Sequence, residues 1–289
     1  MIIYSIPGFS DPFSSISHLF MAVVFFILSF YLIFKGRGNT GRVIGLSIYC
    51  FCLIFLSCMS GVYHLLDKGY TARYVLQILD YSAIFTLIAG TITPIHLILF
   101  RGLNRWLVLF IVWSLAITGL TFTAVFFKSI PEWLSLSFFL GLGWFGLYTT
   151  YSIYKIHNRE LVKYIVLGGA FYTIGAIIEF IRFPIIVSGI IGPHEIFHIF
   201  VFLGALSHWV LIYKIAGFPI SKKIIILVKC FPDGKFEAKA TSEHIYFFGT
   251  SKQEIKTRAL EWVKKEFHDE MKPNLVTFKY FDEERIDVN

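Results

Sequence analysis

The chain has 289 residues, of which 56% are hydrophobic and 18% aromatic, and its mean hydropathy is +0.69. A soluble domain of this length rarely exceeds about half apolar residues, so the composition excludes an ordinary soluble protein and indicates a polytopic membrane protein. The formal net charge of +7 is assigned to loops on the cytoplasmic side rather than to nucleic-acid binding. The four cysteines show no paired metal-ligand spacing and indicate no disulfide framework.

Apolar runs of about 17 to 25 residues are long enough to cross a bilayer as helices. The chain contains seven of them, at 18–34, 43–66, 74–100, 106–127, 133–156, 161–183 and 195–216. Short segments that carry glycine, proline or charged residues separate the runs. The sequence therefore predicts an all-α polytopic fold over residues 1–217, namely a seven-transmembrane helix bundle.

The composition changes after Gly217, because residues 218–289 hold 13 Lys and Arg and 12 Asp and Glu. Strands are expected at 222–231, 235–240 and 274–281, with a turn at Asp233-Gly234 and an amphipathic helix over 250–271. This segment is predicted to be a small soluble α+β appendage on the cytosolic side. It carries no recognisable catalytic motif, so an interaction module with a cytosolic partner or a stabilising module is expected.

Lys and Arg gather on one side of the predicted bundle. The first, third and fifth loops and the start of the tail hold eleven of them, and the opposite side holds four. Cytoplasmic loops carry the excess of positive charge, so the tail is predicted in the cytoplasm and the N-terminus outside.

Ionisable residues in membrane spans are costly and suggest function. The spans or their ends contain His18, His64, Asp80, His96, Glu179, His194, Glu195, His198 and His208. His18 opens the first span, His64 closes the second, Asp80 lies early in the third, and His194 and His198 open the seventh. With alternating spans, these five residues fall near the face that bears the N-terminus, which predicts one polar cluster.

The cluster has the chemistry of a metal site. His194 and His198 are four residues apart and share one helix face, so both suit a tetrahedral Zn²⁺, with His64 as a third ligand and water as the fourth. Ser60 precedes His64 by four residues and could orient that ligand, the water or a substrate carbonyl. Asp80 could partner a ligand histidine or accept a proton from the water.

Glu195 makes the stretch read H-E-x-x-H, the pattern of zinc metalloproteases. It points about 100° away from His194 around the helix, and no suitable third ligand follows it. The protease hypothesis is therefore rejected, and Glu195 is expected at the helix N-terminus, where the dipole favours a carboxylate.

The remaining polar residues are given structural interpretations. His208 lies 14 residues after His194, about 21 Å along the helix and too far to share its metal, and is expected to form an interhelical hydrogen bond or to lie at the end of the span on the opposite face. Glu179 and Arg182 form a pair that can satisfy itself. Asp11 and His18 fit either residues that support the ligands or residues at headgroup level, and the second interpretation is favoured.

The segments "SGVYHLL", "ILDYSAIFTLIAGTITP" and "GPHEIFHIFVFLGALSHW", with "DPFSSISHLF" near the start, resemble the hemolysin III and adiponectin-receptor family of seven-span proteins. The resemblance covers roughly residues 11–216. It implies a buried Zn²⁺ held by His64, His194 and His198, with Ser60 and Asp80 as partners. A wider superfamily that includes alkaline ceramidases shares this pattern, which implies hydrolysis of a lipid amide.

Three functions are consistent with these residues. The first is a membrane zinc hydrolase that acts on an amide or ester bond of a ceramide-like lipid, with Asp80 and Ser60 as catalytic residues. The second is a receptor or sensor with a structural zinc. The third is a lytic or channel-like protein. The predicted spans show no line of polar residues that crosses the whole membrane, which counts against a wide pore.

Overall fold

The computed structural model describes residues 8–156, 159–218, 223–241, 245–266, 273 and 275–282. The chain divides into two compact units, one formed by residues 1–35 and 44–216 and the other by residues 36–43 and 217–289. The first unit contains the apolar helices and the second contains a small sheet with one helix, and each is described by itself.

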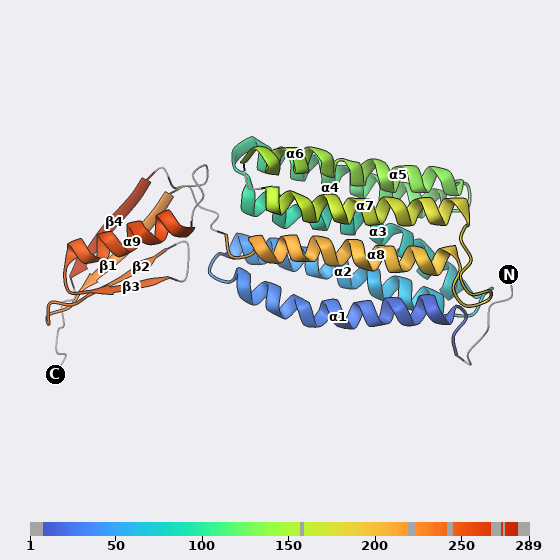
Figure 1. Ribbon diagram of the computed structural model, residues 1–289, viewed down its shortest axis with the longest axis horizontal. Coiled ribbons are helices and arrows are strands. Elements are labelled where there is room, and N and C mark those ends of the chain that lie inside the picture. Colours follow the sequence, from blue (N-terminus) through green and yellow to red (C-terminus); the bar gives the residue numbers. More distant parts are fainter. Residues whose placement is uncertain are drawn as a thin grey trace. The chain divides into compact units, whose positions relative to one another are not determined.

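The first unit is a bundle of helices that lie side by side along their length (Figure 1). In chain order they are α1 (Pro12–Gly36), α2 (Thr40–Leu65), α3 (Thr71–Leu99), α4 (Gly102–Phe126), α5 (Glu132–Trp144), α6 (Gly146–Ile156), α7 (Arg159–Ile181) and α8 (Pro193–Ile215). Among the described residues, six of these helices are long and apolar enough to cross a membrane, namely α1, α2, α3, α4, α7 and α8.

The predicted span at 133–156 does not form one continuous helix. It is divided at Phe145 into α5, of 13 residues, and α6, of 11 residues, so neither reaches the length of a span by itself. Gly141, Gly143 and Gly146 surround the break, and glycine lowers helix stability by about 1 kcal/mol per residue relative to alanine. The backbone tightens there, because the Phe145 amide donates to the Leu142 carbonyl at 3.2 Å. The prediction of seven continuous spans is therefore not confirmed.

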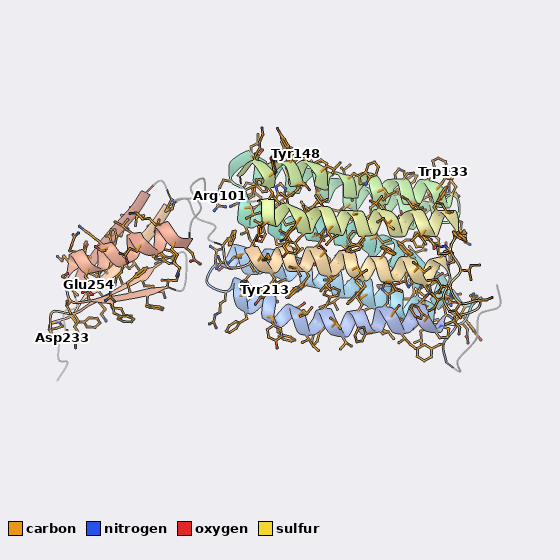
Figure 2. The ribbon with its side chains drawn as sticks, viewed as in Figure 1. Arg101, Trp133, Tyr148, Tyr213, Asp233 and Glu254 are labelled. Carbon is orange, nitrogen blue, oxygen red and sulfur yellow. The ribbon has the colours of Figure 1, made fainter. Side chains whose placement is uncertain are left out.

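The outer surface of the bundle is apolar. Large side chains such as Phe20, Phe30 and Phe110 are 62%, 62% and 71% exposed, and Figure 2 shows such side chains projecting outward along the helices. α3 is the central helix, because 78% of its apolar window is buried, against 28–50% for the other five long helices. Water would penalise so much exposed apolar surface, whereas lipid accepts it. The chain is a multi-pass integral membrane protein.

The second unit contains four described strands, β1 (Lys223–Cys230), β2 (Phe236–Ala240), β3 (Tyr246–Gly249) and β4 (Leu275–Asp282), in the order β3-β2-β1-β4. β1 pairs with β2 antiparallel and with β4 parallel, and β2 pairs with β3 antiparallel. Helix α9 (Lys252–Glu266) buries Ile255, Ala259 and Val263, which recur every four residues along one face of the helix. They pack with alternate β1 residues, such as Ile226, in one small core. The short strand β3 was missing from the sequence-based prediction.

Candidate metal centre

Three histidines meet at the end of the bundle where α1 and α8 begin and α2 ends (Figure 1). His64 lies in the last turn of α2, and His194 and His198 lie in the first two turns of α8. One nitrogen from each of the three rings lies within 4.8 Å of the others. His64 and His198 are buried, and His194 is partly exposed. The predicted meeting of these three residues is confirmed.

The spacing of the rings suits a metal ion. The Nε2 atoms of His64 and His194 are 3.2 Å apart. Two ligands at about 2.0–2.1 Å from a tetrahedral metal lie about 3.4 Å from each other. Three neutral imidazoles are a ligand set that Zn²⁺ and several other divalent metals accept. The three histidines therefore fit a metal ion, and their side chains do not by themselves identify it.

Glu195 caps the start of α8 and makes no contact with the histidine rings. Pro193 occupies the first turn, and the Gly192 amide donates to Glu195 Oε2 at 2.9 Å. Ser14 of α1 donates to the other carboxylate oxygen of Glu195 at 3.0 Å. Glu195 thus joins α8 to α1 at the helix N-terminus, as expected, and lies outside the three-histidine group.

Asp11 contacts a ligand candidate directly. Its Oδ2 lies 3.3 Å from His64 Nδ1 and 2.5 Å from Arg73, and Lys68 lies 3.5 Å from Oδ1. Asp11 is only 7% exposed, so the favoured interpretation of a residue at headgroup level was wrong. Burial alone would raise the pKa of Asp11, but hydrogen bonds with His64 and Arg73 and the charges of Arg73 and Lys68 outweigh burial and hold its pKa well below the ordinary value. Asp11 is therefore a carboxylate at neutral pH.

Glu179 makes a second contact of this kind. Its Oε1 lies 3.2 Å from His194 Nδ1 and 2.5 Å from Arg182. The predicted pair with Arg182 is present, but it also includes a histidine of the cluster, which the sequence analysis missed. The alternation of spans that grouped the other polar residues also places the end of α7 at this face, so the same argument would have found Glu179.

Ser60 and Asp80 lie beside the histidines. Ser60 is buried one turn before His64, and the Asp80 carboxylate, on α3, is in hydrogen-bonding contact with it and close to His194. Both predicted residues are thus at the cluster. The carboxylates that contact the Nδ1 atoms of His64 and His194 are Asp11 and Glu179 rather than Asp80.

His18 completes the polar group. Its buried ring packs edge-on against His198, with ring centroids 4.3 Å apart, and neither of its nitrogens has a hydrogen-bond partner in the described part of the chain. One turn earlier, Ser15 donates to the Gly61 carbonyl at 2.8 Å, which joins α1 to α2 beside Ser60. The first two turns of α1 therefore face the cluster.

The other polar residues of the spans have structural partners elsewhere. His208 contacts the Ile165 carbonyl of α7 at 3.3 Å, which confirms the expected interhelical hydrogen bond. His96 contacts the Asn104 carbonyl and the Thr149 hydroxyl, each at 3.0 Å. Neither belongs to the three-histidine group.

A cavity of about 600 Å³ opens at the cluster. His64 and His194 line it together with the exposed charged residues Lys68 and Arg182 and with apolar or aromatic residues, namely Phe13, Ile16, Tyr63 and Ile190. A cavity of this volume is large enough to admit a small molecule or part of a lipid. Two of the three histidines thus lie on the wall of a cavity that can hold a ligand.

Comparisons with known proteins give the family. The sequence model of the family described as "Haemolysin-III related" matches residues 9–209, which include every residue of the cluster. Two similar proteins are "Hemolysin-3" of Bacillus cereus, 30% identical over 172 residues that cover 58% of this chain and 74% of the relative, and "Hemolysin-3 homolog" of Bacillus subtilis (strain 168), 32% identical over 179 residues that cover 62% and 80%. The chain belongs to the haemolysin-III related family.

Proposed function

We propose that the protein is a zinc-dependent hydrolase that cleaves an amide or ester bond of a membrane lipid. The observation that carries the proposal is the meeting of three histidines with a serine–aspartate pair in a lipid-facing bundle, where two of the histidines, His64 and His194, line a cavity. A structural zinc site is closed by four protein ligands, whereas a catalytic site keeps one position open. The partly exposed His194 and the adjoining cavity support the open arrangement.

Each residue has a proposed role. His64, His194 and His198 hold Zn²⁺, which supplies Lewis-acid activation of a water and a carbonyl at neutral pH. Asp80 accepts the proton of the attacking water and delivers it to the leaving amine. Ser60 holds the Asp80 carboxylate in place. The acyl–nitrogen bond breaks, the acyl carbon gains the water oxygen, and the products are a fatty acid and an amine.

The proposed substrate is a ceramide-like lipid that reaches the cavity from the bilayer. The apolar residues of the cavity wall, such as Phe13 and Ile16, suit an acyl chain. The exposed cations Lys68 and Arg182, which also line the cavity, suit a polar headgroup. Membrane lipids are therefore the proposed partners.

The metal content of detergent-purified protein tests the proposal. Wild type is expected to contain about one zinc per chain, and His64→Ala and His194→Ala are expected to lose both the metal and the hydrolysis of a fluorescent ceramide. A His208→Ala variant is the control, because His208 lies outside the cluster. Full activity in a metal-free variant would show that the proposal is wrong.

A second proposal is membrane lysis, which the names of the two relatives suggest. Leakage of a dye from liposomes on addition of purified wild type, retained in His194→Ala, would favour lysis over hydrolysis. A zinc that stabilises the protein without turnover of any tested lipid amide or ester would favour a receptor or sensor with a structural metal.

We also propose that α5 and α6 together form a seventh span. They follow one another along the bundle, and Trp133 lies near one end of it while Tyr148 lies toward the other (Figures 1 and 2). The charge bias of the loops supports an outside N-terminus and a cytoplasmic segment 218–289 that is available to a cytosolic partner.

A further inference from the structure

Two of the three histidines are supported in the same way. His64 Nδ1 faces a carboxylate oxygen of Asp11 at 3.3 Å, and His194 Nδ1 faces a carboxylate oxygen of Glu179 at 3.2 Å. Asp11 precedes α1, and Glu179 lies on α7, so the two carboxylates reach the cluster from different parts of the chain. Both histidines therefore have a carboxylate oxygen as the partner of Nδ1.

A carboxylate on Nδ1 determines which nitrogen remains for a metal. A carboxylate accepts a proton in a hydrogen bond, so Nδ1 carries the hydrogen and Nε2 keeps its lone pair. The two Nε2 atoms face each other at 3.2 Å, a separation at which two bare lone pairs repel unless a cation or a proton lies between them. Both rings are therefore held in the tautomer and direction that place Nε2 at a common point.

Each carboxylate is in turn held in place by an arginine. Arg73 lies 2.5 Å from Asp11, and Arg182 lies 2.5 Å from Glu179. The Asp11 amide also donates to the His64 carbonyl at 2.9 Å, so Asp11 is fixed by both its backbone and its side chain. A carboxylate that is hydrogen-bonded to an arginine is held in position as an acceptor for the histidine.

We propose that Asp11 and Glu179 are positioning residues of the metal centre, which orient His64 and His194 and raise the affinity of the site for a divalent metal. The inference rests on the proposed metal centre and extends it to residues outside the three ligands. Carboxylates that accept from a metal-bound histidine make the ring more basic, and their loss lowers metal affinity about 10- to 100-fold.

His198 differs from the other two histidines. Its buried Nδ1 has no hydrogen-bond partner among the described residues, and the neighbouring ring is that of His18. Affinity is therefore expected to depend on Asp11 and Glu179 together. Replacement of both is expected to reduce it by more than either single replacement.

The test measures binding of Zn²⁺ to full-length, detergent-purified protein by competition with a chelating dye, and binding of Co²⁺ by visible absorption. Glu179→Gln and Asp11→Asn, which keep the side-chain size, are each expected to lose 10- to 100-fold in affinity. The Co²⁺ absorption bands are expected to shift, because ring orientation changes. The unfolding temperature of each metal-free variant is measured alongside and is expected to fall, because the substitution removes the negative charge that pairs with Arg73 or Arg182.

The matched control is Glu195→Gln. Glu195 lies next to His194 in the sequence, but its carboxylate contacts Gly192 and Ser14 rather than a ligand ring. It is expected to bind Zn²⁺ within about twofold of wild type, because the ligands keep their acceptors. An equal loss in Glu195→Gln would overturn the inference, since any nearby charge would then have the same effect.

Unchanged affinity in both Glu179→Gln and Asp11→Asn would overturn the inference and leave the metal centre in place. Asp11 and Glu179 lie in different parts of the chain, so if one variant fails to fold, the other still tests the inference. Wild type that binds neither metal would overturn the metal centre as well. Lipid hydrolysis does not enter the measurement, so an inactive protein that binds zinc would count against the proposed function alone.

Discussion

At the scale of single residues, Asp80 lies in the apolar helix α3 and has Ser60 and His194 as polar neighbours. Ser60 supplies a hydrogen bond from α2, and His194 supplies a nearby ring that can carry charge. The carboxylates in contact with the two ligand rings are Asp11 and Glu179. The role proposed for Asp80 is therefore toward a water or a substrate rather than toward a ligand ring.

Replacement of Asp80 by Asn separates these roles. Asp80→Asn is expected to keep most of the metal and to lose about 10²- to 10⁴-fold in the rate of hydrolysis of a fluorescent ceramide, because an amide cannot accept the proton. Zinc content and kcat of the same preparation are the measurement. Equal rates in variant and wild type would assign Asp80 a structural role.

The role of Ser60 in holding Asp80 is tested by Ser60→Ala, with Ser57→Ala as the control. Both serines are buried on α2, but Ser57 donates to the Leu53 carbonyl of its own helix at 2.8 Å. Ser60→Ala is expected to slow hydrolysis, because a hydrogen bond to a charged group contributes about 1.5–3 kcal/mol. Ser57→Ala is expected to leave the rate close to that of wild type.

At the scale of the helices, close approach of α1 and α2 brings the first turns of α1 to the cluster. A Cβ atom at Gly61 would lie 2.8 Å from Leu19 Cδ2 and 3.2 Å from the Leu19 backbone nitrogen. Only glycine therefore allows this approach, as is common between membrane helices. The approach also allows Ser15 to reach the Gly61 carbonyl.

Gly61→Val is expected to destabilise the bundle. The added side chain forces α1 away from α2, at a cost of about 1–3 kcal/mol, and is expected to lower the unfolding temperature in detergent by several degrees. Metal affinity is expected to fall with it, because Asp11 and His18 move with α1. Thermal unfolding with and without zinc measures both effects.

The comparison variant is Gly141→Ala on α5, where a Cβ would meet no atom within 4 Å. It is expected to leave stability unchanged or to raise it by up to about 1 kcal/mol, since alanine favours helix. If Gly61→Val were as stable as wild type, the helices would be able to separate without loss and the argument from close approach would be wrong.

At the scale of the whole molecule, the number of times the chain crosses the membrane sets the side on which each end of the bundle lies. Six described helices are each long enough, and α5 and α6 are each too short alone. Seven crossings place the two ends of the bundle sequence on opposite sides, and six place them on the same side. The position of segment 218–289 depends on this number.

Labelling of single cysteines decides it. In a background in which the four native cysteines are replaced, Lys128→Cys is expected to react with an impermeant maleimide on intact cells. Lys155→Cys and Asp233→Cys are expected to react only after lysis, because a seventh span and the positive loops place them inside. Lys68→Cys, between α2 and α3, reports the orientation independently of α5 and α6. Reaction of Lys155→Cys on intact cells would contradict the seventh span if Lys68→Cys also reacts, and would contradict the orientation if Lys68→Cys does not.

The sequence alone determined the membrane class, the six long helices and the end of the bundle at which the polar residues gather. Hydropathy, segment length and alternation of direction are properties of the linear chain, so His64, His194, His198, Ser60 and Asp80 could be grouped without a structure. Strands β1, β2 and β4 and helix α9 were also predicted. Apolar residues that alternate along a strand, or recur every three to four residues along a helix, can be recognised within a short stretch of sequence.

Only the tertiary structure decided which polar groups touch. Asp11 meets His64 across 53 residues and Glu179 meets His194 across 15, and these contacts depend on how each helix is rotated about its axis. In a membrane helix both the lipid-facing and the core-facing sides are apolar, so the sequence pattern leaves this rotation undetermined. The division of α5 from α6 at Phe145 was hidden for the same reason, since a continuous apolar run shows length but not continuity of the helix. Packing between helices therefore decided which carboxylate supports which histidine.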